Sequence, residues 1–316
     1  MSRIYEALQK AESDRKLDRR EPESRTPEAS VKSAIYATAV ATAEEEQASA
    51  PAEARPYGEP YVTPVDPNAL DLSQIPVRPW ALSLEQLPSL LERGPAVEQF
   101  RSLRSRIFEL RDISPLKTIM VTSGVPQEGK SFISTNLAMS LARHKNSKVL
   151  LIDGDMRRYT LHQLLGCESH PGLADYLGGK ASVIEVMQRS ESFEGMTPGT
   201  AAIAQNLTFI AGGNGGDKAA DLSGSSRFGE LIRLAAPHFD WIIVDSSPVL
   251  PVSDAVNLAR SCDGVLLVAR SGETKFPIAQ RAQSELKASN ILGFVLNAVE
   301  EQPQVGSYYG YDAAKP

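Results

Sequence analysis

The strongest local signal for chemistry is a glycine-rich octet that ends in lysine and serine. It reads Gly124-Val125-Pro126-Gln127-Glu128-Gly129-Lys130-Ser131. Its glycines let successive backbone N–H groups curl around phosphate oxygens, and a helix that begins at the lysine points the positive end of its dipole toward them. The spacing therefore predicts a loop for ATP, with Lys130 on the β- and γ-phosphates and the Ser131 hydroxyl on Mg²⁺. We include the next residue, Phe132, in this nucleotide site.

Two apolar runs that end in aspartate supply carboxylates for the same chemistry. One is Trp241-Ile242-Ile243-Val244-Asp245; the other is Val149-Leu150-Leu151-Ile152-Asp153, followed by Asp155 and Arg157. In an α/β sheet, ligands bind at the carboxyl ends of the strands. We expect Asp245 and Asp153 to hold Mg²⁺ or accept a proton, with help from Asp155. A surface ion pair of Asp155 with Arg157 is the alternative for the second run.

The elements that must position these residues alternate between strands and helices from about residue 95 to 300. The run at 149–152 is continuously apolar, as is typical of a strand buried on both faces. Strands are expected at 117–122, 149–152, 207–211, 241–244, 264–269 and 291–296, and helices at 131–143, 228–236, 255–261 and 277–287. This alternation predicts an α/β fold with a mostly parallel sheet flanked by helices.

The remaining stretches differ from this domain in composition. Residues 1–16 place Ile4, Leu8 and Ala11 at helical spacing, which predicts a short amphipathic helix. Alanine, glutamate, proline and serine dominate residues 17–94, which predicts a mostly disordered linker with a few residues around 80–91 laid on the domain. Residues 301–316 are polar and contain tyrosines, which predicts a flexible tail.

Composition narrows the classes of function. The formal net charge of −6 argues against a nucleic-acid partner. The two cysteines and four histidines show no metal or redox spacing. The N-terminus lacks the apolar core of a signal peptide, and no apolar run approaches the ~20 residues that span a bilayer. We therefore expect a cytoplasmic protein, for which any membrane role must come through a partner.

The glycine-rich octet and the two aspartate-ending runs, in the order in which they follow one another along the chain, resemble the motifs of the bacterial tyrosine autokinases found in capsule and exopolysaccharide operons. Glu98, Arg101 and Arg104 fit that family's E-x-x-R-x-x-R self-association motif. The segment Gly293–Asn297 resembles its G-h-V-L-N strand, and the opening Ser2–Leu8 resembles that of its stand-alone members. The tyrosines near the end of the chain are similar to its autophosphorylated cluster.

The resemblance implies a Min-type P-loop fold, with residues 95–300 as the kinase domain and ATP and Mg²⁺ as cofactors. It also implies that Asn297 lies near the adenine and that Arg157 belongs to the nucleotide site. The tail tyrosines, phosphorylated in trans, are Tyr308, Tyr309 and Tyr311. The implied partners are further copies of the chain in a homo-oligomer such as a ring, a membrane-anchored polysaccharide co-polymerase as activator, and a cognate tyrosine phosphatase.

Two other functions share this fold. One is a Min-type or partition-type ATPase switch, and the other is a regulatory ATP-binding subunit without kinase activity. The switch class normally has a lysine early in the loop, where this sequence has Val125. The sequence also departs from the kinase pattern, because Asp245 is followed by Ser-Ser-Pro and Tyr159 stands where proline is usual. These departures leave the expected phosphate and metal ligands intact, and we expect an autokinase.

Overall fold

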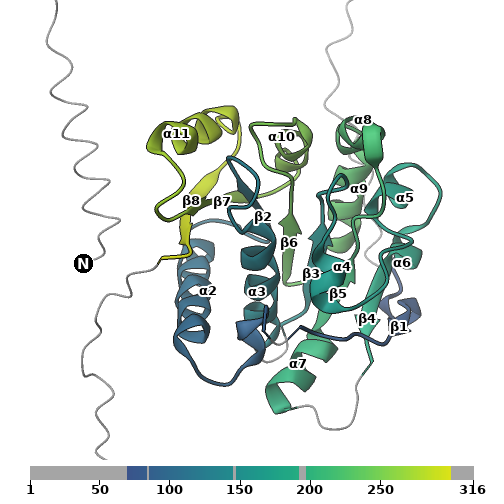
Figure 1. The fold of residues 1–316 in the computed structure, drawn as a ribbon. Coiled ribbons are helices and arrows are strands. Elements are labelled where there is room, and N and C mark those ends of the chain that lie inside the picture. The colour runs from purple at the N-terminus through teal and green to yellow at the C-terminus, as the bar shows by residue number, and fades with distance from the viewer. Residues whose placement is uncertain (1–69, 84, 145–146, 192–196, 300–316) are drawn as a thin grey trace, which may run out of the picture. The chain divides into compact units, whose positions relative to one another are not determined.

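The computed structural model describes residues 70–299, apart from 84, 145–146 and 192–196 (Figure 1). The predicted domain at 95–300 lies almost wholly inside these ranges. The predicted helix at 1–16, most of the predicted linker, and the predicted tail with its three tyrosines lie outside the described residues.

The strands form one sheet in the order β1-β4-β5-β3-β6-β2-β7-β8. Neighbouring strands run parallel, except that β4 and β5 run antiparallel. Their bounds are β1 (Val77–Arg78), β2 (Thr118–Ser123), β3 (Val149–Asp153), β4 (Met187–Ser190), β5 (Leu207–Ile210), β6 (Trp241–Asp245), β7 (Gly264–Arg270) and β8 (Ile291–Asn297). All six predicted strands are present, whereas the short strands β1 and β4 are additions that the sequence does not predict.

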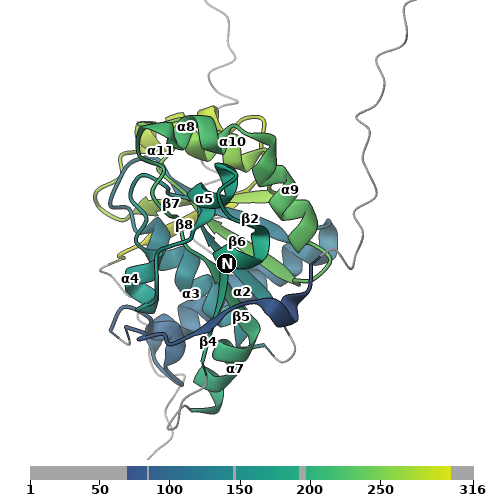
Figure 2. The ribbon, with the colours of Figure 1, turned by 90° about the vertical axis from the view of Figure 1, so that its right-hand side faces the viewer.

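Helices cover both faces of this sheet (Figures 1 and 2). Side chains of α2, α3, α4 and α7 pack on one face, and those of α5, α6, α8, α9, α10 and α11 on the other. Their bounds are α2 (Pro95–Ile113), α3 (Lys130–Ala142), α4 (Leu161–Leu165), α5 (Leu173–Leu177), α6 (Val183–Val186), α7 (Pro198–Asn206), α8 (Ala219–Ser223), α9 (Ser226–Ala235), α10 (Asp254–Ala259) and α11 (Phe276–Glu285). The predicted fold class is confirmed. Within the described ranges, no helix is both long and apolar enough to cross a bilayer.

Strand β3 shows why the central strands are apolar along their whole length. Leu150 and Ile152 belong to the core under one layer of helices, and Val149 and Leu151 belong to the core under the other. Each of these side chains is fully buried, which stabilises the fold by about 1.5–3 kcal/mol per side chain. The aspartate that ends this strand lies in register with the aspartate that ends β6. The fold thus brings two predicted site carboxylates side by side.

The domain begins earlier in the chain than the sequence predicts. Composition predicts a mostly disordered linker up to residue 94, but residues 70–94 contribute β1 and two 3-10 turns, at Leu72–Gln74 and Pro88–Leu90. Trp80, Leu87 and Leu90 are buried in the same core as α2 and α3. The burial of these three large side chains offsets part of the entropy lost in ordering this stretch. These three residues fall around 80–91, the part of the segment that the sequence predicts to lie on the domain, and the elements before them extend this contact back toward residue 70.

Candidate nucleotide and phosphotransfer site

The glycine-rich loop connects β2 to α3, as its sequence predicts. Gln127 and Gly129 have φ angles of 67° and 93°, in the left-handed region that glycine adopts readily and other residues rarely adopt. A Cβ on Gly129 would stand 2.0 Å from the side-chain nitrogen of Asn297. The second glycine of the motif is therefore required both for its backbone conformation and for this close approach.

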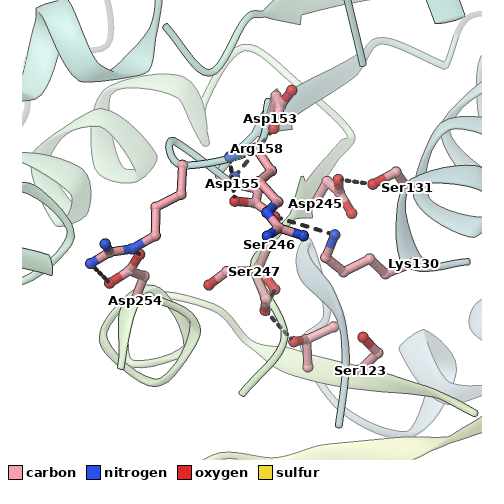
Figure 3. Close-up of polar contacts among 12 residues, drawn as sticks. Ser123, Lys130, Ser131, Asp153, Asp155, Arg158, Asp245, Ser246, Ser247 and Asp254 are labelled. Carbon is pink, nitrogen blue, oxygen red and sulfur yellow. Dashed lines mark hydrogen bonds and ion pairs between the residues drawn. The ribbon is translucent and has the colours of Figure 1, made fainter. Parts of the chain in front are cut away.

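Three carboxylates gather beside the first turn of α3 (Figure 3). Asp153 and Asp245 lie in register at the ends of β3 and β6. The Ser131 hydroxyl donates to Asp245 Oδ2 at 2.6 Å. Lys130 Nζ lies 3.3 Å from Asp155 Oδ2. The structure therefore brings together the four residues predicted to be catalytic and the predicted metal ligand Ser131.

Asp153 is fully buried, and both of its carboxylate oxygens accept backbone hydrogen bonds. Oδ1 accepts from the N–H of Asp155 at 3.2 Å, and Oδ2 from the N–H of Leu161 at 3.1 Å. Burial and the neighbouring charge of Asp245 raise the pKa of the Asp153 carboxyl well above its ordinary value. A carboxylate that binds a proton more tightly than usual is suited to accept one from a substrate.

Lys130 keeps its charge although its side chain is only 15 % exposed. Burial lowers the pKa of its ammonium, but the charges of Asp245, Asp155 and Asp153 raise that pKa by more, so the net shift is upward. The partner carboxylate of Asp155 is itself 3 % exposed. Lys130 therefore compensates buried negative charge in the folded protein as well as being placed for phosphate.

Arg157 forms its ion pair with Asp254 and not with Asp155. Its Nε lies 2.7 Å from Oδ2 of Asp254, the first residue of α10. Asp155 pairs with Lys130 instead, so the alternative of an ion pair between Asp155 and Arg157 is wrong. Arg157 ties the segment after β3 to α10, and its contact with a nucleotide stays a prediction.

Asn297 contacts the loop from the end of β8, and Phe132, within α3, contacts α2. Asn297 Nδ2 donates to the backbone oxygen of Glu128 at 3.0 Å. The Phe132 ring packs edge-on against Phe100 of α2, with centroids 5.7 Å apart. Asn297 therefore supports the loop from β8, whereas Phe132 joins α3 itself to α2. The contact of either residue with a nucleotide stays a prediction.

Two polar residues close to these carboxylates are not predicted from the sequence. Ser247, two residues beyond Asp245, has a buried hydroxyl without a hydrogen-bond partner among the described residues. Its position just after a strand could have indicated it. Asp254 is 1 % exposed, but no local pattern marks it, because its partner Arg157 is 97 residues away in the chain.

The donor set fits a magnesium nucleotide. Asp245 Oδ1 is buried and has no hydrogen-bond partner among the described residues. Such an oxygen costs free energy unless a cation or water meets it. Mg²⁺ in nucleotide sites takes only one or two carboxylates, with phosphates and water as its other ligands. Ser131 and Asp245 are the residues that would hold Mg²⁺, with Asp153 beside them.

Comparison with known proteins gives several relatives, although no family model matches the chain. Tyrosine-protein kinase YwqD of Bacillus subtilis (strain 168) is 33% identical over 220 residues, which cover 69% of this chain and 86% of YwqD. Tyrosine-protein kinase etk of Escherichia coli (strain K12) is 31% identical over 232 residues, which cover 71% of this chain but 30% of etk. The chain likewise spans 26% of tyrosine-protein kinase ptk of Acinetobacter johnsonii.

Solved structures give the same grouping. The kinase domain of Escherichia coli tyrosine kinase ETK is 32% identical, with a TM-score of 0.58 over 68% of this chain and 80% of that one. The chimerical protein CapA2B2 is 26% identical, with a TM-score of 0.61 over 72% of this chain and 96% of that one. With a relative of similar length at one-third identity and with the P-loop and its carboxylates in place, the chain belongs to the family of bacterial tyrosine-protein kinases.

Proposed function

We propose that this chain is an ATP-dependent protein-tyrosine autokinase that regulates exopolysaccharide or capsule synthesis and export. The observation that carries the proposal is the placement of Lys130, Asp153 and Asp245 around one glycine-rich loop. A charged lysine, a carboxylate with a raised pKa and a carboxylate with a free buried oxygen are the groups that phosphoryl transfer to a hydroxyl requires.

Each of these residues would have one task. Lys130 would meet the negative charge that develops on the transferred phosphoryl group. Ser131 and Asp245 would hold Mg²⁺, which neutralises phosphate charge when it is bound. Asp153 would accept the proton of the incoming tyrosine hydroxyl, whose pKa of about 10 makes it easier to deprotonate than serine.

The proposed acceptors are Tyr308, Tyr309 and Tyr311 of a neighbouring copy. Replacing all three by phenylalanine should keep ATP binding and assembly but remove most autophosphorylation, because only the acceptor hydroxyls are lost. Mass spectrometry of the purified protein after incubation with ATP and Mg²⁺ measures the phosphotyrosine. Tyr159→Phe, within the described domain, is the matched control and should leave the phosphotyrosine unchanged. Undiminished phosphotyrosine at other tyrosines of the triple variant would show that the tail is not the substrate.

Self-association is proposed to use the face of α2 that carries Glu98, Arg101 and Arg104. At about 100° per residue, steps of three residues keep the trio within about 120° of the helix circumference. Glu98 and Arg101 are half-exposed and lie 2.5 Å apart at Oε1 and Nη1. Arg104 is partly buried and donates to the backbone oxygen of Ser140 at 2.7 Å. Arg101 is therefore the better residue to test, because replacing Arg104 would also disturb its contact with α3.

Arg101→Ala is expected to lower the assembly mass that light scattering records, because it removes a charge from the proposed contact with the neighbouring copy. Arg106→Ala is the matched control, since Arg106 makes the same kind of pair with Glu109 on the same helix. Loss of either intrahelical pair alone costs only about 0.2–0.5 kcal/mol. An unchanged mass for Arg101→Ala, where the wild type is oligomeric, would assign the residue to its intramolecular pair.

The proposed partners beyond further copies are a membrane-anchored polysaccharide co-polymerase, which activates the kinase and recruits it to the membrane, and a cognate tyrosine phosphatase. About −1.5 to −2 charges per phosphate would repel a phosphorylated tail from an acidic neighbour. Assembly and dispersal would then follow phosphorylation. A co-polymerase cytoplasmic segment that leaves the rate of autophosphorylation unchanged would argue against activation by this partner.

The second candidate function is an ATPase switch of the Min or partition type. It shares the fold and the loop, and Val125 in place of a lysine argues against it. A switch would assemble with ATP and form no phosphotyrosine. The same mass spectrometry therefore separates the two functions.

A further inference from the structure

Glu128 is an acid within a loop that is built to hold phosphates. Its side chain is 2 % exposed, and a like charge at this position works against phosphate binding. Oε2 accepts the backbone N–H of Val125 at 2.9 Å, inside the same loop. Oε1 accepts the hydroxyl of Thr274, from the segment between β7 and α11. Both oxygens of this buried carboxylate are therefore engaged in holding the loop to itself and to a neighbouring segment.

Thr274 connects this acid to the end of strand β7. Its hydroxyl accepts the backbone N–H of Arg270, the last residue of β7, at 2.8 Å and donates its proton to Glu128. A hydroxyl has a single hydrogen to donate, and here it goes to the Glu128 carboxylate, while a lone pair of the same oxygen accepts the N–H of Arg270. Serine could make both contacts, whereas valine, which has nearly the same shape as threonine, could make neither.

Two more contacts join the same edge of the sheet to the loop. Asn297, the last residue of β8, donates to the backbone oxygen of Glu128 at 3.0 Å. Arg270 Nη1 lies 3.4 Å from the backbone oxygen of Gln127. With a φ of 67°, Gln127 is in a backbone region that non-glycine residues keep only where the surroundings hold it there. The ends of β7 and β8 supply part of that support.

We propose that Thr274 is a positioning residue for nucleotide binding, which acts through Glu128 to hold the glycine-rich loop in its phosphate-binding conformation. The proposal rests on the proposed function only in requiring that this loop bind ATP. A loop already held in its bound shape does not pay for ordering when the ligand arrives. Loss of the hydrogen bond between Thr274 and Glu128 should therefore weaken binding of the phosphates while the protein stays folded.

The test is calorimetric titration of the full chain with a non-hydrolysable ATP analogue and Mg²⁺. Thr274→Val is expected to raise the Kd on the order of tenfold, the size expected for one lost hydrogen bond to a charged group. Thr274→Ser should stay within about twofold of the wild type. Thr200→Val in α7 is the matched control, because the hydrogen-bond partner of its hydroxyl among the described residues is Thr197, and it should leave the Kd unchanged.

The route through Glu128 is tested in a Glu128→Ala background. There, Thr274→Val should add less than about twofold, because its partner is already gone. A further tenfold loss would overturn the route. The proposal would be overturned if Thr274→Val bound the analogue with wild-type affinity. It would also be overturned if Thr274→Ser or Thr200→Val lost as much affinity for the analogue as Thr274→Val. Circular dichroism checks that each variant is folded, and Thr274→Ala replaces the valine variant if that one does not fold. Failure of the wild type to bind would instead refute the nucleotide site itself.

Discussion

Replacing Lys130 by methionine is expected to lower the ATP turnover rate by about 10²–10³-fold, the usual cost of removing one group that stabilises transition-state charge. Methionine keeps most of the length of the side chain and removes the ammonium. The rate of phosphate release at saturating ATP and Mg²⁺ measures the effect. An unchanged rate would contradict the assignment of the loop.

The same substitution should also weaken the ligand-free fold, because Lys130 compensates the buried carboxylate of Asp155. The pKa of Lys130 is raised above its ordinary value of 10.5. The stability that follows from this shift is fully present below 10.5 and is lost as the pH rises through the raised pKa. The thermal midpoint of Lys130→Met should therefore lie below that of the wild type at neutral pH and approach it in strong alkali. Turnover must be compared at a temperature where both proteins are folded.

Asp153→Asn is expected to lower phosphotransfer to tyrosine by about 10²–10⁴-fold, the usual contribution of a positioned general base. The amide keeps one acceptor oxygen but takes up a proton far less readily than the carboxylate. Phosphotyrosine formed per minute is the measurement. Near-normal transfer in this variant would place the proton acceptor elsewhere. Asp245→Asn provides the comparison, since it should lose the Mg²⁺-dependent activity through a weakened metal site while the general base remains.

The raised pKa of Asp153 gives this variant a second signature that is independent of activity. Burial raises the pKa above the ordinary 3.8, so the protonated form favours folding. The associated stability is fully present below 3.8 and is lost as the pH rises through the raised value. Asp153→Asn lacks this titration, so its thermal midpoint should fall less with rising pH than that of the wild type. Parallel curves for the two proteins would contradict the raised pKa.

Local patterns in the sequence predict a large part of this fold and of its site. Continuous apolar runs locate the strands β3 and β6, because a strand covered by helices on both faces buries the side chains of both its faces. The glycine-rich octet locates the phosphate loop, because only its spacing allows the backbone to turn into a helix at Lys130. The ends of parallel strands meet at one edge of the sheet, so Asp153 and Asp245 could be placed together before any coordinates were known.

Other features depend on contacts between residues far apart in the chain. Arg157 is hydrogen-bonded to Asp254, which is 97 residues away in the chain, and Glu128 to Thr274, which is 146 residues away. The composition of residues 70–94 predicts only that a few residues around 80–91 lie on the domain, and the packing decides that Trp80, Leu87 and Leu90 are the ones that enter the core.

Propensity and periodicity describe a residue's immediate neighbours along the chain. By themselves, the sequence patterns therefore determined which segments become strands, helices and the phosphate loop. The tertiary structure decided which charged and hydroxyl groups pair around that loop. The physical reason is that a buried polar group must find its partner in space, and only the packed sheet and helices bring distant segments within hydrogen-bonding distance.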